Sequence, residues 1–97
     1  MYGTVFNLNV KSDHKEKLIE VMKRNERISE GMVAWFLMNP DDDNEDLIGV
    51  AVFENKDAHL ANANNPDQHE YFVAMMEHLN SEPTWTDGEY VAGQIVR

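Results

Sequence analysis

Residues 32–53, MVAWFLMNPDDDNEDLIGVAVF, decide the fold of this chain. Two apolar runs, 32–39 and 47–53, flank an acidic turn. The turn consists of Pro40 and residues 41–46. Each run has the length of a strand and is rich in β-branched and aromatic residues. Because the connection is short, we predict that the two strands pair as an antiparallel hairpin.

The segments on either side of the hairpin complete an alternating order of strands and helices. We predict a strand over 2–10, a helix from Ser12 or Asp13 to about Arg27, a helix over 56–63, a break at 64–66, a helix over 67–79, and a last strand between 87 and 96 after an Asp-Gly turn at 87–88. The inner stripe of the first helix is predicted to hold Leu18, Val21, Met22, Asn25 and Ile28. The order β-α-β-β-α-β is typical of ferredoxin-like folds. We therefore expect an α+β fold, with a four-stranded antiparallel sheet and both helices on one face, in a single domain over 1–97.

Both faces of the hairpin strands are apolar. Trp35 and Phe36 point to opposite faces of one strand, and Val50 and Ala51 do so in the other. Helices on one side of the sheet leave the other face uncovered, and an exposed apolar face marks an interface. We predict a homodimer in which two sheets pack face to face about a twofold axis. An open sheet that grips a larger partner is the alternative, and the pattern leaves open which face meets the helices.

The charge is strongly negative and unevenly distributed. The net charge is −10, and residues 41–97 carry thirteen acidic groups against two basic ones. Such a surface repels phosphate backbones and anionic lipids, so we expect no nucleic-acid partner and no membrane partner. No apolar run approaches the roughly 20 residues of a membrane span, and residues 1–10 lack signal-peptide features, so we expect a cytoplasmic protein. The absence of cysteine excludes thiol nucleophiles, disulfides and Cys-ligated metals.

Three stretches carry a resemblance to a known family. Residues 31–35, GMVAW, are similar to its glycine-led second strand, and residues 52–58, VFENKDA, to its third strand running into a helix. Residues 59–72 are similar to its broken helix, with the break at Asn65-Pro66 and with His69 beyond it. On these stretches and on the order of elements over the whole chain, the sequence resembles the antibiotic-biosynthesis-monooxygenase-like family of the dimeric α/β-barrel superfamily.

The resemblance implies a ligand pocket within each monomer, between the sheet and the helices. The family includes small oxygenases that use no metal or flavin and oxidise quinols, anthrones and similar aromatics, and it also includes haem-degrading enzymes. We therefore expect a cofactor-independent monooxygenase that acts on an electron-rich aromatic. The alternatives are a non-catalytic, small-ligand-binding or stress-associated dimeric domain, and a haem-binding or haem-degrading protein.

His69 and Asn7 are the candidate catalytic residues. His69 shares a predicted helix face with Phe72 and could act as a general base, or it could reach solvent. Asn7 is polar within an apolar strand, at a position that resembles the first-strand Asn of the haem-degrading branch. Alternatively, its amide bonds to a loop or faces water. The candidate residues of the ligand pocket are Trp35, Asn62, Tyr71, Phe72 and Met76.

The haem-degrading branch also needs a Trp and a His on the broken helix. At the Trp position this chain has Asn62 or Ala61. At the His position it has Tyr71 or Phe72, so an axial His is missing there.

Metal binding is not expected either. His59, His69 and His78 are ten and nine residues apart, which fits no ligand spacing on one helix face. The acidic stretch 41–46 lacks the glycine and the glutamate of an EF-hand loop. We predict that His14, His59 and His78 lie exposed on helices, and we expect no metal and no other cofactor.

Overall fold

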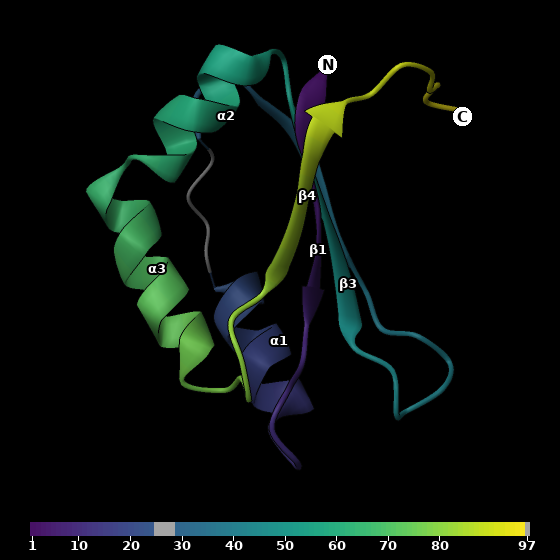
Figure 1. The fold of residues 1–97 in the computed structure, drawn as a ribbon, viewed down its shortest axis with the longest axis vertical. Coiled ribbons are helices and arrows are strands. Elements are labelled where there is room, and N and C mark those ends of the chain that lie inside the picture. Colours follow the sequence, from purple (N-terminus) through teal and green to yellow (C-terminus); the bar gives the residue numbers. More distant parts are fainter. Residues whose placement is uncertain (25–28, 97) are drawn as a thin grey trace.

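The computed structural model describes residues 1–24 and 29–96, and its elements follow the predicted order. They are β1 (Tyr2–Leu8), α1 (Lys15–Lys23), β2 (Met32–Met38), β3 (Leu47–Phe53), α2 (Lys56–Ala63), α3 (Pro66–Met76) and β4 (Thr84–Glu89). The strands form one sheet in the order β2-β3-β1-β4, in which all neighbours are antiparallel (Figure 1). The fold is therefore the predicted β-α-β-β-α-β arrangement, with the second helix broken in two.

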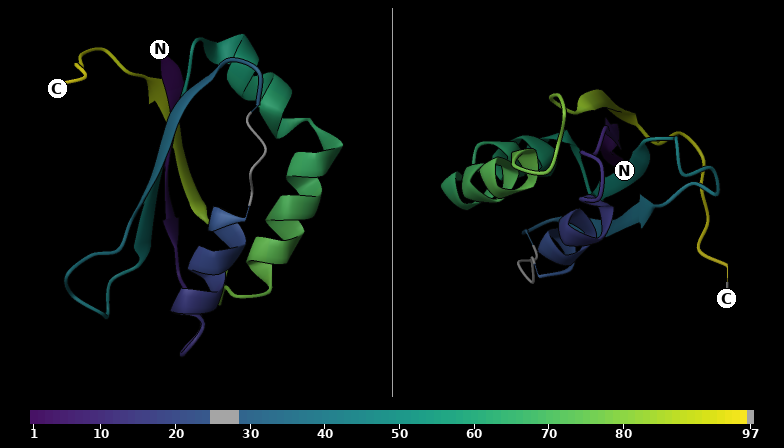
Figure 2. Two further views of the ribbon diagram at one scale, coloured as in Figure 1. Left: turned by 180° about the vertical axis from the view of Figure 1, so that it is seen from behind. Right: turned by 90° about the horizontal axis from the view of Figure 1, so that it is seen from below.

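All three helices lie on one side of the sheet (Figure 2). Leu18 and Met22 project from α1 onto the sheet and are buried there. The core is built from Phe6, Leu8, Leu18, Met22, Leu47, Met75 and Leu79. Burial of these side chains between one sheet face and the helices holds the two layers together.

Strand register decides which face of the sheet meets the helices. In β1 and β3, Tyr2 is paired with Phe53 and Thr4 with Ala51, and these residues face the helices. A register shift in β2 between Met32 and Ala34 marks a bulge, and Trp35 is paired with Ala51 on the helix side.

The opposite side of the sheet, called here the outer face, is apolar and uncovered. Its apolar side chains are Val5, Ala34, Phe36, Met38, Ile48, Val50 and Val52. Phe36 is 67% exposed and Met38 is 60% exposed. The outer face is thus the bare apolar surface that the hairpin sequence predicts.

Asparagines cap the two parts of the broken helix. The side chain of Asn55 accepts a hydrogen bond from the backbone N–H of Ala58 at the start of α2. The side chain of Asn65 does the same for Asp67 at the start of α3, where Pro66 occupies the first turn. Proline needs no N–H partner there and cannot continue α2, so the break is fixed by sequence.

Several predicted boundaries differ from the structure, and β1 ends at Leu8 rather than at residue 10. The cap of α1 is His14, whose side chain makes no capping bond, because Asp13 adopts a left-handed conformation with φ 65°. The described part of α1 ends at Lys23, and the rest of its predicted length, with Asn25, Arg27 and Ile28, lies outside the described residues. Helix α3 ends at Met76 rather than near Leu79, which instead bridges to Val10.

The last strand was predicted too late in the chain. It spans Thr84–Glu89, and the expected turn at Asp87 and Gly88 lies inside it. Both residues pair with β1, Asp87 with Thr4 and Gly88 with Gly3. Strand β4 lies at the edge of the sheet, where a glycine costs little packing, so pairing overrides the local turn preference.

His14 and His78 join the start of α1 to the end of α3, although both were predicted to be exposed. Their Nδ1 atoms are 3.0 Å apart, and both side chains are half-buried. One of the two Nδ1 atoms must lack a proton to accept the hydrogen bond, so at least one of the two rings is neutral. Partial burial lowers the pKa of His14, and the charges of Lys17 and His78 act in the same direction.

We expect the lowered pKa of His14 to make stability depend on pH. Because the folded-state pKa of His14 is below its unfolded value, the unfolded chain takes up the proton first as pH falls. The stabilisation is therefore complete above about pH 6.5 and is lost below it. Melting curves should show a larger drop between about pH 7.5 and pH 5.5 for the wild type than for His14→Gln. An equal drop in the two proteins would contradict this, and His69→Gln serves as the control.

Candidate active site

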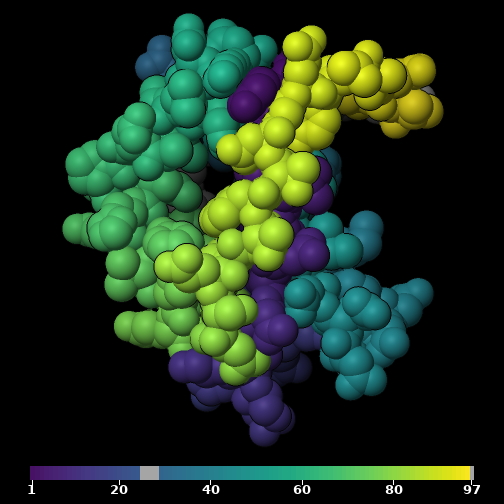
Figure 3. Space-filling model, in the orientation of Figure 1, coloured from purple at the N-terminus to yellow at the C-terminus, as the bar shows by residue number. Residues whose placement is uncertain are grey.

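A cavity of about 360 Å³ lies between the helix-facing side of the sheet and the broken helix. The surface is hollowed between the green helices and the yellow β4 in Figure 3. The lining is mainly aromatic and methionine side chains, namely Phe6, Met22, Met32, Trp35, Phe53, Tyr71, Phe72, Met75 and Trp85. Polar lining residues are Thr4, His59, Asn62, Gln68, His69 and Asp87. A mostly apolar cavity of this size with few polar groups is typical of a small-molecule site.

Three neighbouring aromatic rings, two from the sheet and one from α3, shape one wall of the cavity. The Phe6 ring lies over Gly49 of the neighbouring strand, so closely that a Cβ at Gly49 would collide with it. The Phe6 and Trp85 ring centroids are 4.9 Å apart, and those of Phe72 and Trp85 are 6.5 Å apart. The rings of each pair are tilted by about 40° relative to each other, and all three residues line the cavity.

Five of the residues predicted for the site line this cavity. They are Trp35, Asn62, His69, Tyr71 and Phe72. Asn62 comes from α2, and its side-chain oxygen accepts a hydrogen bond from the Ser29 hydroxyl. The break between α2 and α3 therefore brings polar and aromatic side chains from both helices to one cavity.

Two predicted residues lie elsewhere. Met76 packs against the hydrophobic core, and its neighbour Met75 lines the cavity in its place. Asn7 is exposed and lies on the outer face, because neighbouring residues of a strand point to opposite sides and Phe6 faces the cavity. The structure therefore separates Asn7 from His69 by the thickness of the sheet.

Tyr71 is the one tyrosine in the described lining of the cavity. Burial raises the pKa of Tyr71 to about 12. Its hydroxyl thus keeps its proton at neutral pH and is unsuited to act as a base.

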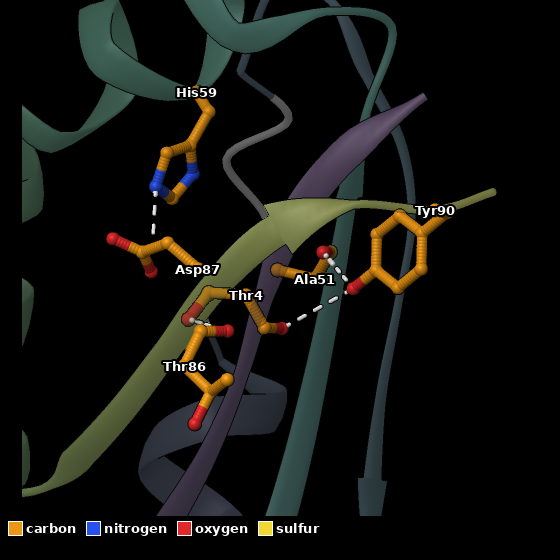
Figure 4. A network of polar contacts seen from close by, with 6 residues as sticks. All are labelled: Thr4, Ala51, His59, Thr86, Asp87 and Tyr90. Carbon is orange, nitrogen blue, oxygen red and sulfur yellow. Dashed lines mark hydrogen bonds and ion pairs between the residues drawn. The ribbon is translucent and has the colours of Figure 1, made fainter.

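His59 and Asp87 form a polar pair that the sequence interpretation missed. The Nε2 atom of His59 lies 3.9 Å from Oδ1 of Asp87 (Figure 4). The His59 side chain is 13% exposed rather than on the helix surface as predicted. It packs against Tyr2 and Phe53, whose ring centroids lie 5.4 and 5.2 Å away. The sequence interpretation missed the pair because it assigned Asp87 to a turn, where the side chain would not face α2. In the structure, Asp87 lies within β4.

A second network near this pair holds the strands in register. The Tyr90 hydroxyl donates to the backbone oxygen of Ala51 at 2.9 Å and lies 3.4 Å from that of Thr4 (Figure 4). The Thr4 hydroxyl donates to the backbone oxygen of Thr86 at 3.3 Å. Burial raises the pKa of Tyr90, which keeps this hydroxyl a donor. Hydrogen bonds from the Thr4 and Tyr90 hydroxyls to backbone oxygens thus connect β1, β3 and β4.

The described residues contain no group of three or more His, Asp or Glu side chains placed to hold a metal ion. Within the same residues, no helix has the length and apolar character needed to cross a membrane.

The proteins that match this chain are found among solved structures. No family model matches the sequence, and no curated protein matches it either. A Nitrosomonas europaea protein described as an antibiotic biosynthesis monooxygenase superposes with a TM-score of 0.82, at 14% identity, over 95% of this chain and 100% of that one. This chain has the antibiotic biosynthesis monooxygenase fold.

Further structures of the same fold agree. A Bordetella bronchiseptica protein of the same description gives a TM-score of 0.80 at 13% identity, over 94% of this chain and 97% of that chain. A variant of MhuD, solved with two manganese protoporphyrin IX molecules per active site, gives 0.79 at 16% identity, over 99% of this chain and 100% of that chain. At these identities the likeness is one of fold, and it bears out the fold that the sequence resemblance implies.

Proposed function

We propose that this protein is a monooxygenase that oxidises an electron-rich aromatic of the quinol or anthrone type inside the cavity, without a bound metal or flavin. The cavity itself carries the proposal. It is about 360 Å³, lined by aromatic rings and methionines, and supplied with few polar groups. The fold shared with antibiotic biosynthesis monooxygenases supports this function.

The reaction needs little from the protein beyond binding, desolvation and proton transfer. Loss of a proton makes the bound aromatic an anion, which can pass an electron to dioxygen. In an anthrone, the methylene carbon then forms a bond to oxygen and becomes a carbonyl. Its two hydrogens leave with the second oxygen atom as water, so the substrate itself supplies all four electrons and no other reductant is needed.

His69 is the proton acceptor in this proposal. It lines the cavity from the first turns of α3, and its exposed side chain can return the proton to water. Asn7, which lies on the outer face, has no part in the step. Tyr71 supplies a hydrogen bond to a developing oxyanion, because its raised pKa keeps it protonated.

The same proposal includes a homodimer built on the outer face. Of the seven apolar side chains on that face, Val5, Phe36 and Met38 are exposed and the other four are half-buried, and a second copy of the same face is the simplest surface to cover them. Val91, Ile95 and Val96, which follow β4, add exposed apolar surface. Because the cavity lies on the other side of the sheet, dimer formation leaves it accessible.

A non-catalytic binding protein is the second candidate. Its support is the small number of ionisable lining groups, which are His59, His69, Tyr71 and Asp87 among the described residues. Haem binding has less support. No lysine or arginine belongs to the described lining, although the propionates of a porphyrin call for cationic partners.

Oxygen consumption by the purified protein tests the proposed function. We expect uptake above the blank with at least one member of a panel of anthrones and quinols, and slower uptake in His69→Gln by about 10²-fold or more. Binding of a panel member without oxygen uptake would favour the second candidate. A Soret shift on addition of haem would favour the haem-binding alternative.

A further inference from the structure

We propose that His59 and Asp87 form a clamp for one hydroxyl group at the rim of the cavity, so that the ligand is a neutral, hydroxylated aromatic rather than a carboxylated one. The inference rests on the proposed function in that the cavity must hold an aromatic. It adds the polar group by which that aromatic is recognised, and it assigns this role to two residues outside the predicted site.

The spacing of the pair suits a bridging hydroxyl. At 3.9 Å, His59 Nε2 and Asp87 Oδ1 are too far apart for a direct hydrogen bond. If an oxygen atom lay about 2.8 Å from both atoms, the angle at that oxygen between His59 Nε2 and Asp87 Oδ1 would be about 90°. This angle allows the oxygen to form one hydrogen bond to each group. His59 and Asp87 both line the cavity, so that such an oxygen can belong to the ligand.

The two groups are complementary to a hydroxyl. An ionised Asp87 only accepts hydrogen bonds, and Nε2–H of His59 donates when its proton is on that nitrogen. A hydroxyl does both, because its hydrogen is donated to the carboxylate while its oxygen accepts from the imidazole. An ether oxygen can only accept, and a ligand carboxylate would place a second negative charge beside Asp87.

The His59 ring is positioned by packing rather than by hydrogen bonds. Tyr2 and Phe53 flank it, and its Nδ1 atom is buried without a hydrogen-bond partner in the described part of the chain. Asp87 is held by the pairing of β4 with β1, which sets it opposite Thr4. The packing thus fixes the His59 ring, and the strand pairing fixes the backbone of Asp87, whose side chain is 51% exposed at the rim of the cavity.

The charge of the cavity favours a neutral ligand. Asp87 is the one acidic residue of the described lining, and no lysine or arginine accompanies it there. A carboxylated aromatic would find repulsion at the clamp and no cation elsewhere among these lining residues. The net charge of −10 acts in the same direction at longer range.

Calorimetric titration with three matched probes tests the clamp. The probes are 2-naphthol, its methyl ether 2-methoxynaphthalene, and 2-naphthoate, measured at pH 7. We expect 2-naphthol to bind the wild type about tenfold or more tightly than the ether. His59→Phe keeps the ring packing and should reduce this preference to less than about twofold, with the affinity for the ether unchanged. Asp87→Asn should strengthen 2-naphthoate binding by about fivefold or more.

Glu89→Gln is the matched control for charge. Glu89 lies two residues further along β4, on the same side of the strand, and is not part of the cavity lining. It should change none of the three affinities. A hydroxyl preference that persists in His59→Phe, or that is lost in His69→Gln instead, would overturn the clamp.

The outcome can be separated from that of the proposed function. A clamp confirmed by the probes, together with no oxygen uptake on the panel, would refute the oxygenase and leave the hydroxyl site standing. Oxygen uptake with equal binding of naphthol and its ether would refute the clamp and leave the oxygenase standing. Failure of all three probes to bind the wild type would overturn the clamp.

Discussion

Replacement of Phe36 by glutamate is expected to convert a dimer into a monomer. Phe36 is 67% exposed within the outer face, between apolar neighbours on β2 and β3. In the proposed dimer, position 36 of both protomers lies in the interface. The substitution would therefore bury two unpaired carboxylates. We expect the dissociation constant to rise by about a thousandfold or more, measured by sedimentation velocity over a range of concentrations.

Val73→Glu is the control for that experiment. Val73 is 49% exposed, but it lies on α3 and not on the outer face. The same charge at this site should leave the dimer intact. A wild-type protein that sediments as a monomer, or a Phe36→Glu variant that still forms dimers, would contradict face-to-face packing of the sheets.

Filling the cavity from the sheet is expected to abolish ligand binding and turnover. Ala51 lines the cavity from the central strand β3, opposite Thr4 and Trp35. Ala51→Phe places a phenyl ring in a space of about 360 Å³ that already has aromatic walls. The backbone oxygen that accepts from Tyr90 is retained. We expect at least a hundredfold loss of affinity or of kcat/KM, with a stability change of at most about 3 kcal/mol.

Ala61→Phe makes the same change on the exposed side of α2 and provides the comparison. It should leave binding and turnover near the wild-type values. Undiminished activity in Ala51→Phe would show that the reaction takes place outside this cavity.

The order of elements could be predicted from sequence because most elements have strong local sequence signals. The long-range packing in the structure agrees with these signals. The apolar runs 32–39 and 47–53 and the Asn65-Pro66 break each have one simple structural interpretation. The edge strand β4 has no such simple interpretation. Its Asp-Gly pair favours a turn more strongly than the Thr-Trp-Thr segment before it favours a strand. Its position depends on pairing with β1, which no local pattern contains.

The site was harder to predict because it depends on which way single residues point. Both faces of the hairpin are apolar, so periodicity could not say which one meets the helices. Asn7 and Phe6 differ by one position in β1, and that position decides between the outer face and the cavity. Met75 and Met76 differ in the same way on α3.

The His59–Asp87 pair shows the largest gap between sequence and structure. The two residues are 28 positions apart and come from a helix and an edge strand. No motif spacing joins them. Recognition of residues 84–89 as a strand would have placed Asp87 on the same side as Trp85, which is the one sequence signal that could have led to the pair.

Isotope labelling of the product tests the central claim, that the cavity oxidises an aromatic with dioxygen, most directly. The protein would be incubated with an anthrone under ¹⁸O₂, and the product analysed by mass spectrometry beside Ala51→Phe and a protein-free blank. The account predicts one ¹⁸O atom in the quinone formed by the wild type, with product in Ala51→Phe at the level of the blank. A product without the label, or equal labelled product from Ala51→Phe, would contradict it.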